Sequence, residues 1–224
     1  KMSEIRVENI IGETGTDAVK FTKGINVTGI VTATNVSIGS SVTATNFFGS
    51  GAGLSGVGGI AQVITAQDVT TGSLALSSQG TLYDVPNMNV TITPASSSSK
   101  FLISYQITGE TDGGGVHAHS IVLKRAISGG ATTLIRGDNS TSRTGIFNQQ
   151  ASIYYNADND STPEIASVAN YLDSPSASAA VTYTVQMQDH EATGTFYYNR
   201  CVSNNNDASR ERGISWLTIM EVVV

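Results

Sequence analysis

The five residues VTATN occur twice in this chain, at positions 31–35 and 42–46, eleven positions apart. Their alternating β-branched and small polar residues predict short strands, and the glycines around them predict tight turns. Side chains this small cannot fill a core of their own, so a repeat of this kind needs a stacked neighbour or another chain. The repeat therefore favours a fibrous, oligomeric structural protein over an enzyme.

The composition limits the classes of protein that fit this chain. Of the 224 residues, 13% are charged and 39% hydrophobic, and 23 are glycine, which allows one large β core but few long helices. The formal net charge of −6 argues against a nucleic-acid partner, because phosphates require a basic surface. No apolar run is long enough for a transmembrane helix and no signal-peptide pattern occurs, so no membrane insertion is expected.

Three zones follow one another along the chain. Residues 1–23 hold two short apolar runs around a glycine-rich turn, and residues 24–59 hold the repeat and a glycine-rich exit. From residue 60 to residue 224 the pattern is that of a globular β domain. We therefore predict an N-terminal attachment segment, a shaft with a hinge, and a C-terminal head.

The clearest period-two patterns lie at residues 100–108 and 180–188. The predicted inward side chains are Phe101, Ile103, Tyr105, Ile107, Val181, Tyr183, Val185 and Met187, and the side chains between them are predicted to face water. Further strands are predicted at 89–93, 119–126, 132–137, 146–156, 195–202 and 216–223, with a hairpin turn at 127–133. The segment 163–172 fits either a strand or a helical turn. The predicted fold class is all-β, with a short fibrous β shaft followed by a β-sandwich head of jelly-roll type.

Several segments follow one another in an order typical of one family: the opening MSEIRVENIIGETGTDAVKFTK, the shaft end NFFGSGAGLSG, and VTITPASSSSKFLISYQI, IVLKR, TTLIRGD, YLDSP, VTYTVQ and RGISWLTIMEV in the head. In this order they resemble the small tail-fibre and virion structural proteins of tailed bacteriophages of the marine or cyanobacterial type. The resemblance implies a homotrimeric fibre, assembled in the host cytoplasm and displayed on the particle exterior. Its N-terminal segment would attach to baseplate, tail or capsid proteins, and its head would face the host.

The resemblance brings no catalytic residues and no cofactor with it, so we predict a non-enzymatic fibre whose head binds a host receptor or glycan. A capsid or baseplate decoration protein without receptor binding is the alternative, and a polysaccharide-cleaving spike is less favoured. A spike would need a pair of carboxylates. The candidate pairs, which we interpret as solvated turn residues, are Glu110 with Asp112, Asp158 with Asp160, and Asp189 with Glu191.

Two segments have the spacing of metal ligands. His117 and His119 would share one face of a strand, where two imidazoles can converge on a transition metal, but we interpret both as loop or surface histidines. Asp158, Asp160 and Glu164 place oxygen atoms as calcium loops do, yet the glycine and distal glutamate of an EF-hand are missing. An Asx-rich turn is the favoured interpretation of that segment, and no metal site is assigned.

Four other features remain. The tripeptide 136–138 reads Arg-Gly-Asp but sits where a strand must turn, and Cys201 is predicted to be a buried, inert thiol. Arg200, Arg210 and Arg212 are interpreted as surface partners of Asp207 and Glu211. In the tyrosine pairs 154–155 and 197–198, one ring of each pair is predicted to face the core and the other to face outward. The outward rings suit an interface between chains, or less favourably a sugar.

Overall fold

The computed structural model describes residues 59–112, 119–140, 143–149, 163–190, 194–208 and 210–223, together with residues 26, 28 and 30. Contacts within the chain divide it into two units, Lys1–Gly51 and Ala52–Val224, and the fold given below is that of the second unit. The VTATN repeat and the segment before it lie outside the described residues. The shaft and the boundaries at residues 23 and 59 therefore stay predictions.

The described part of the second unit is built from β-strands alone. They are β1 (Gly59–Asp68), β2 (Gly72–Leu76), β3 (Tyr83–Ile92), β4 (Lys100–Asp112), β5 (His119–Ile127), β6 (Thr132–Ile135), β7 (Asn148–Gln149), β8 (Glu164–Asp173), β9 (Val181–Asp189), β10 (Gly194–Tyr198) and β11 (Ser215–Val223). The fold class is thus all-β, as the period-two patterns predicted. A helix long and apolar enough to cross a membrane is not found in these ranges.

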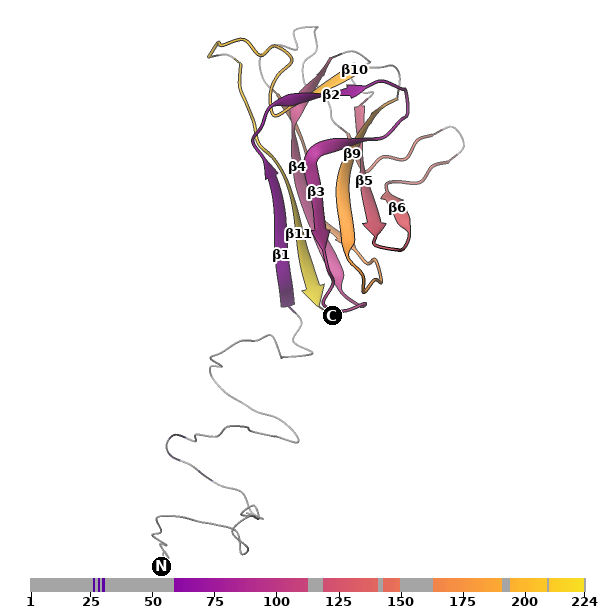
Figure 1. Ribbon diagram of the computed structural model, residues 1–224, viewed down its shortest axis with the longest axis vertical. Helices are drawn as coiled ribbons and strands as arrows, with labels where there is room; N and C mark the ends of the chain where they lie inside the picture. The colour runs from indigo at the N-terminus through magenta and orange to yellow at the C-terminus, as the bar shows by residue number, and fades with distance from the viewer. Residues whose placement is uncertain are drawn as a thin grey trace, which may run out of the picture. The chain divides into compact units, whose positions relative to one another are not determined.

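The strands form two antiparallel sheets (Figure 1). The first has the order β1-β11-β4-β8, with β10 pairing the end of β4 beyond β11 and β2 pairing β10. The second has the order β3-β9-β5-β6, and β7 pairs the start of β5 on the same edge as β6. The three short strands β2, β7 and β10 are additions to these sheets. When the other eight strands are renumbered from 1 to 8 along the chain, the first sheet has the order 1-8-3-6 and the second sheet has the order 2-7-4-5. This is the strand order of a jelly roll, which confirms the predicted type of sandwich.

The core lies between the two sheets and contains the side chains that the alternation predicted. The inward residues of β4 and β9 are fully buried: Phe101, Ile103, Tyr105, Ile107, Val181, Tyr183, Val185 and Met187. The rings of Phe101 and Tyr183 meet edge to face across the sheets, with centroids 5.9 Å apart. Leu217 and Ile219 of β11 and Ile121 and Leu123 of β5 complete the centre of the core.

The outer face of β9 departs from the prediction. Thr184, Gln186 and Gln188 were predicted to face water, but all three are buried. β9 lies between β3 and β5, so the neighbouring strands place polar side chains over it. Gln186 Nε2 donates to Asp84 on β3 at 2.6 Å, and Gln188 Nε2 donates to Ser120 on β5 at 3.2 Å. The alternation was right, but the second face is a packed polar layer.

The ambiguous segment 163–172 is a strand, because β8 pairs with β4 along Gly109↔Glu164 to Phe101↔Asp173. A hairpin joins β5 to β6 as predicted: Gly130 N donates to Ile127 O at 2.9 Å, and Gly129 has φ of 68°. The sequence analysis named neither β1 nor β2 as a strand. In β1, Val63 and Ile64 put apolar side chains on both faces and hide the alternation, and β2 has only five residues.

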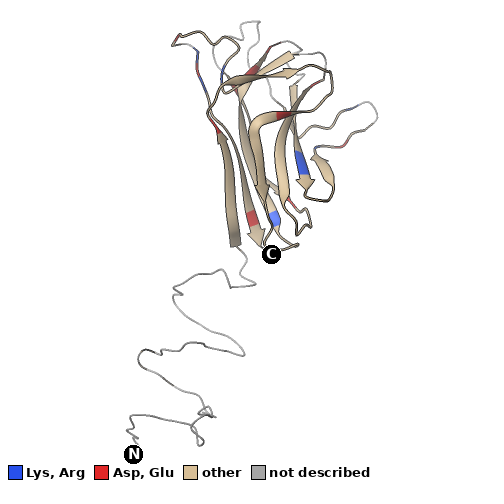
Figure 2. Ribbon diagram, in the orientation of Figure 1, with Lys and Arg blue, Asp and Glu red and all other residues tan. Residues whose placement is uncertain are grey.

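The head has two ends, which we name for the strands that lie there. At the base, β1 begins and β11 ends, since Gly59 pairs with Val223. At the distal end lie β2, β10 and the connection from β10 to β11, drawn orange to yellow in Figure 1. Charged residues are sparse on the ribbon: several lie on the distal connection, and others lie along the strands and at the base (Figure 2).

A buried carboxylate fixes the base of the head. Glu221 of β11 has no exposed surface, and its two oxygens accept hydrogen bonds from Gln62 Nε2 and from Ala95 N, each at 2.6 Å. Burial alone would raise the pKa of Glu221. Hydrogen bonds from the Ser99 side chain, from Gln62 and from the backbone at 95–96 outweigh it, and the pKa ends below its usual value.

The Glu221→Gln variant is expected to lose the part of the acid sensitivity of the native head that comes from this carboxylate. A lowered folded pKa means that the carboxylate stabilises the fold fully above the unfolded pKa of 4.5, and that this stability is lost as the pH falls below it. The measurement is the free energy of unfolding by denaturant between about pH 6 and about pH 3. Parallel pH profiles for the native chain and the variant would contradict the assignment.

Candidate functional site

The distal end holds a tyrosine and several arginines that face outward. On β10, Tyr198 packs against the core and Tyr197 faces outward, as predicted for this pair. Tyr197 OH donates to Asp112 Oδ2 at 2.7 Å, and Thr195 N donates to Asp112 Oδ1 at 2.9 Å. The hydrogen bond to Asp112, followed by burial, raises the pKa of Tyr197. Tyr197 is therefore a fixed, neutral phenol.

Arg200 lies against the same ring, with its guanidinium carbon 4.4 Å from the centroid of Tyr197. It donates to the carbonyl oxygens of Cys201 and Val202 at 2.9 and 2.8 Å. The interpretation of Arg200 as the partner of a surface carboxylate was wrong, because these carbonyls and the ring take up its guanidinium. One face of Tyr197 is thus covered, which removes that face as a platform for a sugar.

The connection from β10 to β11 is anchored to the scaffold at its first residues. Asn199 is fully buried with φ of 58°, and its amide donates to the carbonyl oxygens of Asp68 and Thr70. Its side-chain oxygen accepts from Ser215 at 2.7 Å, and Glu110 accepts from Val202 N at 2.6 Å. Further along, Arg212 donates to Asn204 at 3.1 Å. The start and end of this connection are therefore rigid.

Cys201 is buried, as predicted, and its Sγ donates to the carbonyl oxygen of Ser203 at 2.8 Å. Burial, followed by the charge of Glu110, raises the pKa of this thiol. A protonated, enclosed thiol is a poor nucleophile. The cysteine therefore belongs to the packing of the distal connection.

A second polar cluster joins β5 to the end of β9. Ser120 Oγ and His190 Nε2 lie 2.6 Å apart, and Gln188 Nε2 is 3.2 Å from both. A serine beside a histidine is the start of a nucleophilic site. Here Ser120 is only 1% exposed, so its hydroxyl offers no access to a substrate. We assign this cluster to packing, and no motif in the sequence had singled it out.

His119 lies beside this cluster and is buried, so its interpretation as a loop or surface histidine was wrong. His119 is the first residue of β5 and pairs with Asp189 of β9, and its Nε2 is 3.3 Å from Asp189 Oδ2. Burial lowers the pKa of His119 against the pull of Asp189 and Asp112. His117 lies outside the described residues, and within them no three histidine, cysteine or acidic side chains gather as metal ligands do.

The candidate carboxylate pairs are only partly described, because Asp158, Asp160 and Glu191 lie outside the described residues. Glu110 and Asp189 were interpreted as solvated turn residues, which was wrong: both lie in strands and are buried. Asp112 accepts hydrogen bonds from Thr195 N and Tyr197 OH of β10. Glu164, the last residue of the segment interpreted as an Asx-rich turn, is instead buried at the start of β8. The Arg136-Gly137-Asp138 tripeptide follows the end of β6, where Gly137 N donates to Ile146 O at 2.9 Å. This is the turn that was predicted.

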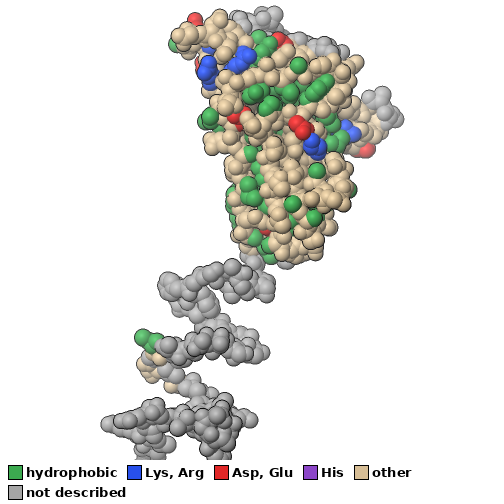
Figure 3. Space-filling view, viewed as in Figure 1, with side chains coloured by type: hydrophobic (Ala, Val, Ile, Leu, Met, Phe, Trp, Pro, Cys, Tyr) green, Lys and Arg blue, Asp and Glu red, His purple; other side chains and the backbone are tan. Residues whose placement is uncertain are grey.

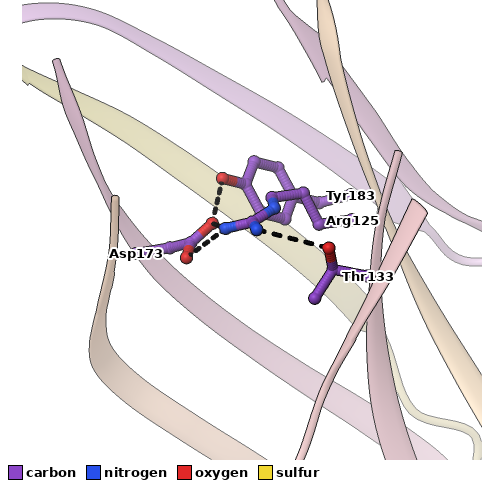
Figure 4. A network of polar contacts seen from close by, with 4 residues as sticks. All are labelled: Arg125, Thr133, Asp173 and Tyr183. Carbon is purple, nitrogen blue, oxygen red and sulfur yellow. Dashed lines mark hydrogen bonds and ion pairs between the residues drawn. The ribbon is translucent and has the colours of Figure 1, made fainter. Parts of the chain in front are cut away.

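The strongest charge cluster joins the two sheets and was missed by the sequence analysis (Figure 4). Arg125 of β5 donates from Nη1 to both oxygens of Asp173 on β8, at 2.7 and 2.8 Å. Tyr183 OH of β9 donates to Asp173 at 2.6 Å, and Thr133 of β6 lies 3.4 Å from Arg125 Nη2. Burial, followed by the bond to Asp173, raises the pKa of Tyr183. The cluster closes the core near the base and presents no reactive group.

No protein-family model and no curated protein matches this chain. Among solved structures, it is similar to the VP2 subviral particle of infectious bursal disease virus, with 11% identity and a TM-score of 0.33. The similarity covers 72% of this chain and 39% of the VP2 chain, so the chain spans about two fifths of the length of that structure. A likeness of this extent carries no argument about what this chain does.

Proposed function

We propose that the protein is a non-enzymatic structural component of a phage virion, a short fibre that ends in a jelly-roll head. The observation that carries the proposal is the strand order of the head, 1-8-3-6 and 2-7-4-5, directly after a repeat that needs partner chains. Jelly rolls recur in viral capsid and lectin domains, both of which act by binding, so the fold supports this function by analogy. The resemblance of the ordered segments to small phage fibre proteins supports the same function.

The finer proposal is that the distal end contacts the host surface while residues 1–23 attach to the virion. In its support, the connection from β10 to β11 is anchored at both ends and carries the exposed Arg212, on a rigid β scaffold. Anchored loops on a rigid scaffold are a common arrangement for recognition. A decoration protein that stabilises the particle remains the competing proposal, because it would use the same fold without a receptor.

Binding to cells separates the two proposals. Fluorescently labelled full-length protein is expected to bind host cells saturably, and an Arg212→Ala variant is expected to lose most of that binding with an unchanged far-UV spectrum. The matched control is Arg143→Ala, a basic residue of the described head outside the distal connection. Binding to particles but not to cells would favour the decoration protein. Release of reducing sugar from host polysaccharide would instead revive the spike.

A further inference from the structure

One apolar row crosses the outer face of the first sheet from edge to edge. Val63 of β1 pairs with Met220 of β11, Met220 pairs with Leu102 of β4, and Leu102 pairs with Leu172 of β8. Side chains opposite one another on neighbouring strands point to the same side and touch. At 4.8 Å per strand the row spans about 14 Å. We call these four residues the outer row.

The outer row is solvent-accessible at both ends, and its surroundings are neutral except for Lys100, which lies in the next row toward the base. Val63 is 52% exposed and Leu172 is 50% exposed, while Met220 and Leu102 are half-buried between them. The next rows toward the distal end contain only neutral polar side chains and the single tryptophan: Thr65, Thr218 and Ser104, then Gln67, Trp216 and Gln106. In the view of Figure 3 most of the surface of the head is neutral, and the charged side chains lie in its upper half. Apolar side chains aligned on a nearly neutral sheet face are typical of an interface.

The geometry points to another copy of this chain as the occupant of this face. The repeat at residues 31–46 needs partner copies, and the chain that follows it enters the head at Gly59, the first residue of β1. Val63 lies four residues further, about 13 Å along the strand. Copies joined through the repeat therefore bring their β1 strands together at a high effective concentration.

Charge favours the same occupant. Two copies that each have a net charge of −6 repel one another, and they approach most easily through a surface that carries no charge. The rows on the distal side of Val63 carry no charge, and the next row on the base side adds Lys100, whose charge is opposite to the net charge of the chain. The distal end instead holds several arginines and acidic residues. We propose that the outer row packs against other copies and holds the heads of a homotrimer together. The proposal rests on the short fibre proposed above and on the homotrimer that the resemblance to phage fibre proteins implies.

Cysteine cross-linking of the full chain tests this contact. The native thiol is removed with Cys201→Ser, and Val63→Cys is compared with Val69→Cys, which is 64% exposed in the turn after β1 and away from the outer row. With a short bis-maleimide, we expect covalent dimers and trimers from Val63→Cys at a rate at least about tenfold above that of Val69→Cys, because only the first thiol is held near its copies. Equal rates would overturn the proposal.

A second pair of variants uses the single tryptophan as a reporter. Trp216 lies on the same face of β11 as Met220, so it senses whether this face is covered. Val63→Lys in the full chain is expected to shift the emission of Trp216 to longer wavelength, and Val69→Lys is expected to leave it unchanged. An edge strand tolerates lysine, so Val63→Lys should fold.

Light scattering on the same samples separates this proposal from the proposed function. A mass of three chains with no cross-linking through Val63→Cys and no emission shift overturns the head contact alone, since the repeat then holds the copies together. A mass of one 23.3 kDa chain overturns the homotrimer and the head contact together. The binding of cells or particles is measured independently of both results.

Discussion

Replacing Arg125 with methionine is expected to destabilise the head by about 3–5 kcal/mol, because the change leaves a carboxylate uncompensated inside the protein. Asp173 is 7% exposed and receives both of its shortest nitrogen contacts from Arg125, at 2.7 and 2.8 Å. In the variant only Tyr183 OH still donates to it. Since Asp173 belongs to β8 and Arg125 and Tyr183 belong to the other sheet, the loss also weakens the closure of the sandwich (Figure 4).

The neighbouring residue provides a matched control. Lys124 also contacts both oxygens of an aspartate, Asp84, at 2.7 and 2.8 Å, but that carboxylate is 55% exposed and keeps its water. Lys124→Met is therefore expected to cost about 1 kcal/mol or less. Denaturant titration of both variants at one protein concentration gives the comparison. If both variants lost the same free energy of unfolding, the burial of Asp173 between the sheets would not increase the contribution of its ion pair.

Phe101→Ala is expected to destabilise the head by about 3–5 kcal/mol as well, by a different route. Phe101 is fully buried on β4 and meets the ring of Tyr183 edge to face. Its removal leaves a cavity between the sheets, where closely packed strands cannot collapse onto the space. The loss is measured as the change in the midpoint of denaturant unfolding at a constant slope.

The control for Phe101 is an exposed side chain with a single contact. Thr91 of β3 lies on the surface and shares a hydrogen bond of 2.8 Å with Thr182. Thr91→Ala is expected to change the free energy of unfolding by about 1 kcal/mol or less. A Phe101→Ala variant no less stable than Thr91→Ala would mean that Phe101 does not pack between the sheets as described.

The fold was predictable where a strand is apolar on one face only. Strands β4 and β9 have that pattern, and their inward residues lie in the core as expected. Strand β1 was not predicted, because Val63 belongs to the outer row while Ile64 packs against the core. Two neighbouring residues are therefore both apolar, and the period-two pattern is hidden. A pattern in one strand cannot show that a second apolar face is aligned with those of three other strands.

The polar sites were the least predictable part. Arg125 and Asp173 are 48 residues apart, and nothing local indicates that they meet. Glu110, Asp189 and His119 were interpreted as exposed because they flank segments rich in glycine, asparagine or serine, whereas pairing of their strands buries them. Local composition predicts turns well. It does not predict which polar side chains a neighbouring strand will cover.

The pairing of β1 with β11 has a mechanical consequence. Gly59 lies at the base, and β1 runs from there toward the distal end beside β11, with partners from Gly59↔Val223 to Asp68↔Ser215. When the head is held at its distal end and pulled at Gly59, the load is directed along β1. The backbone hydrogen bonds of this pair then share the load in shear, instead of opening one after another. A force applied to the chain at Gly59 is therefore resisted by all the backbone hydrogen bonds between β1 and β11. To be pulled away from the head, β1 must separate from β11 in a single step.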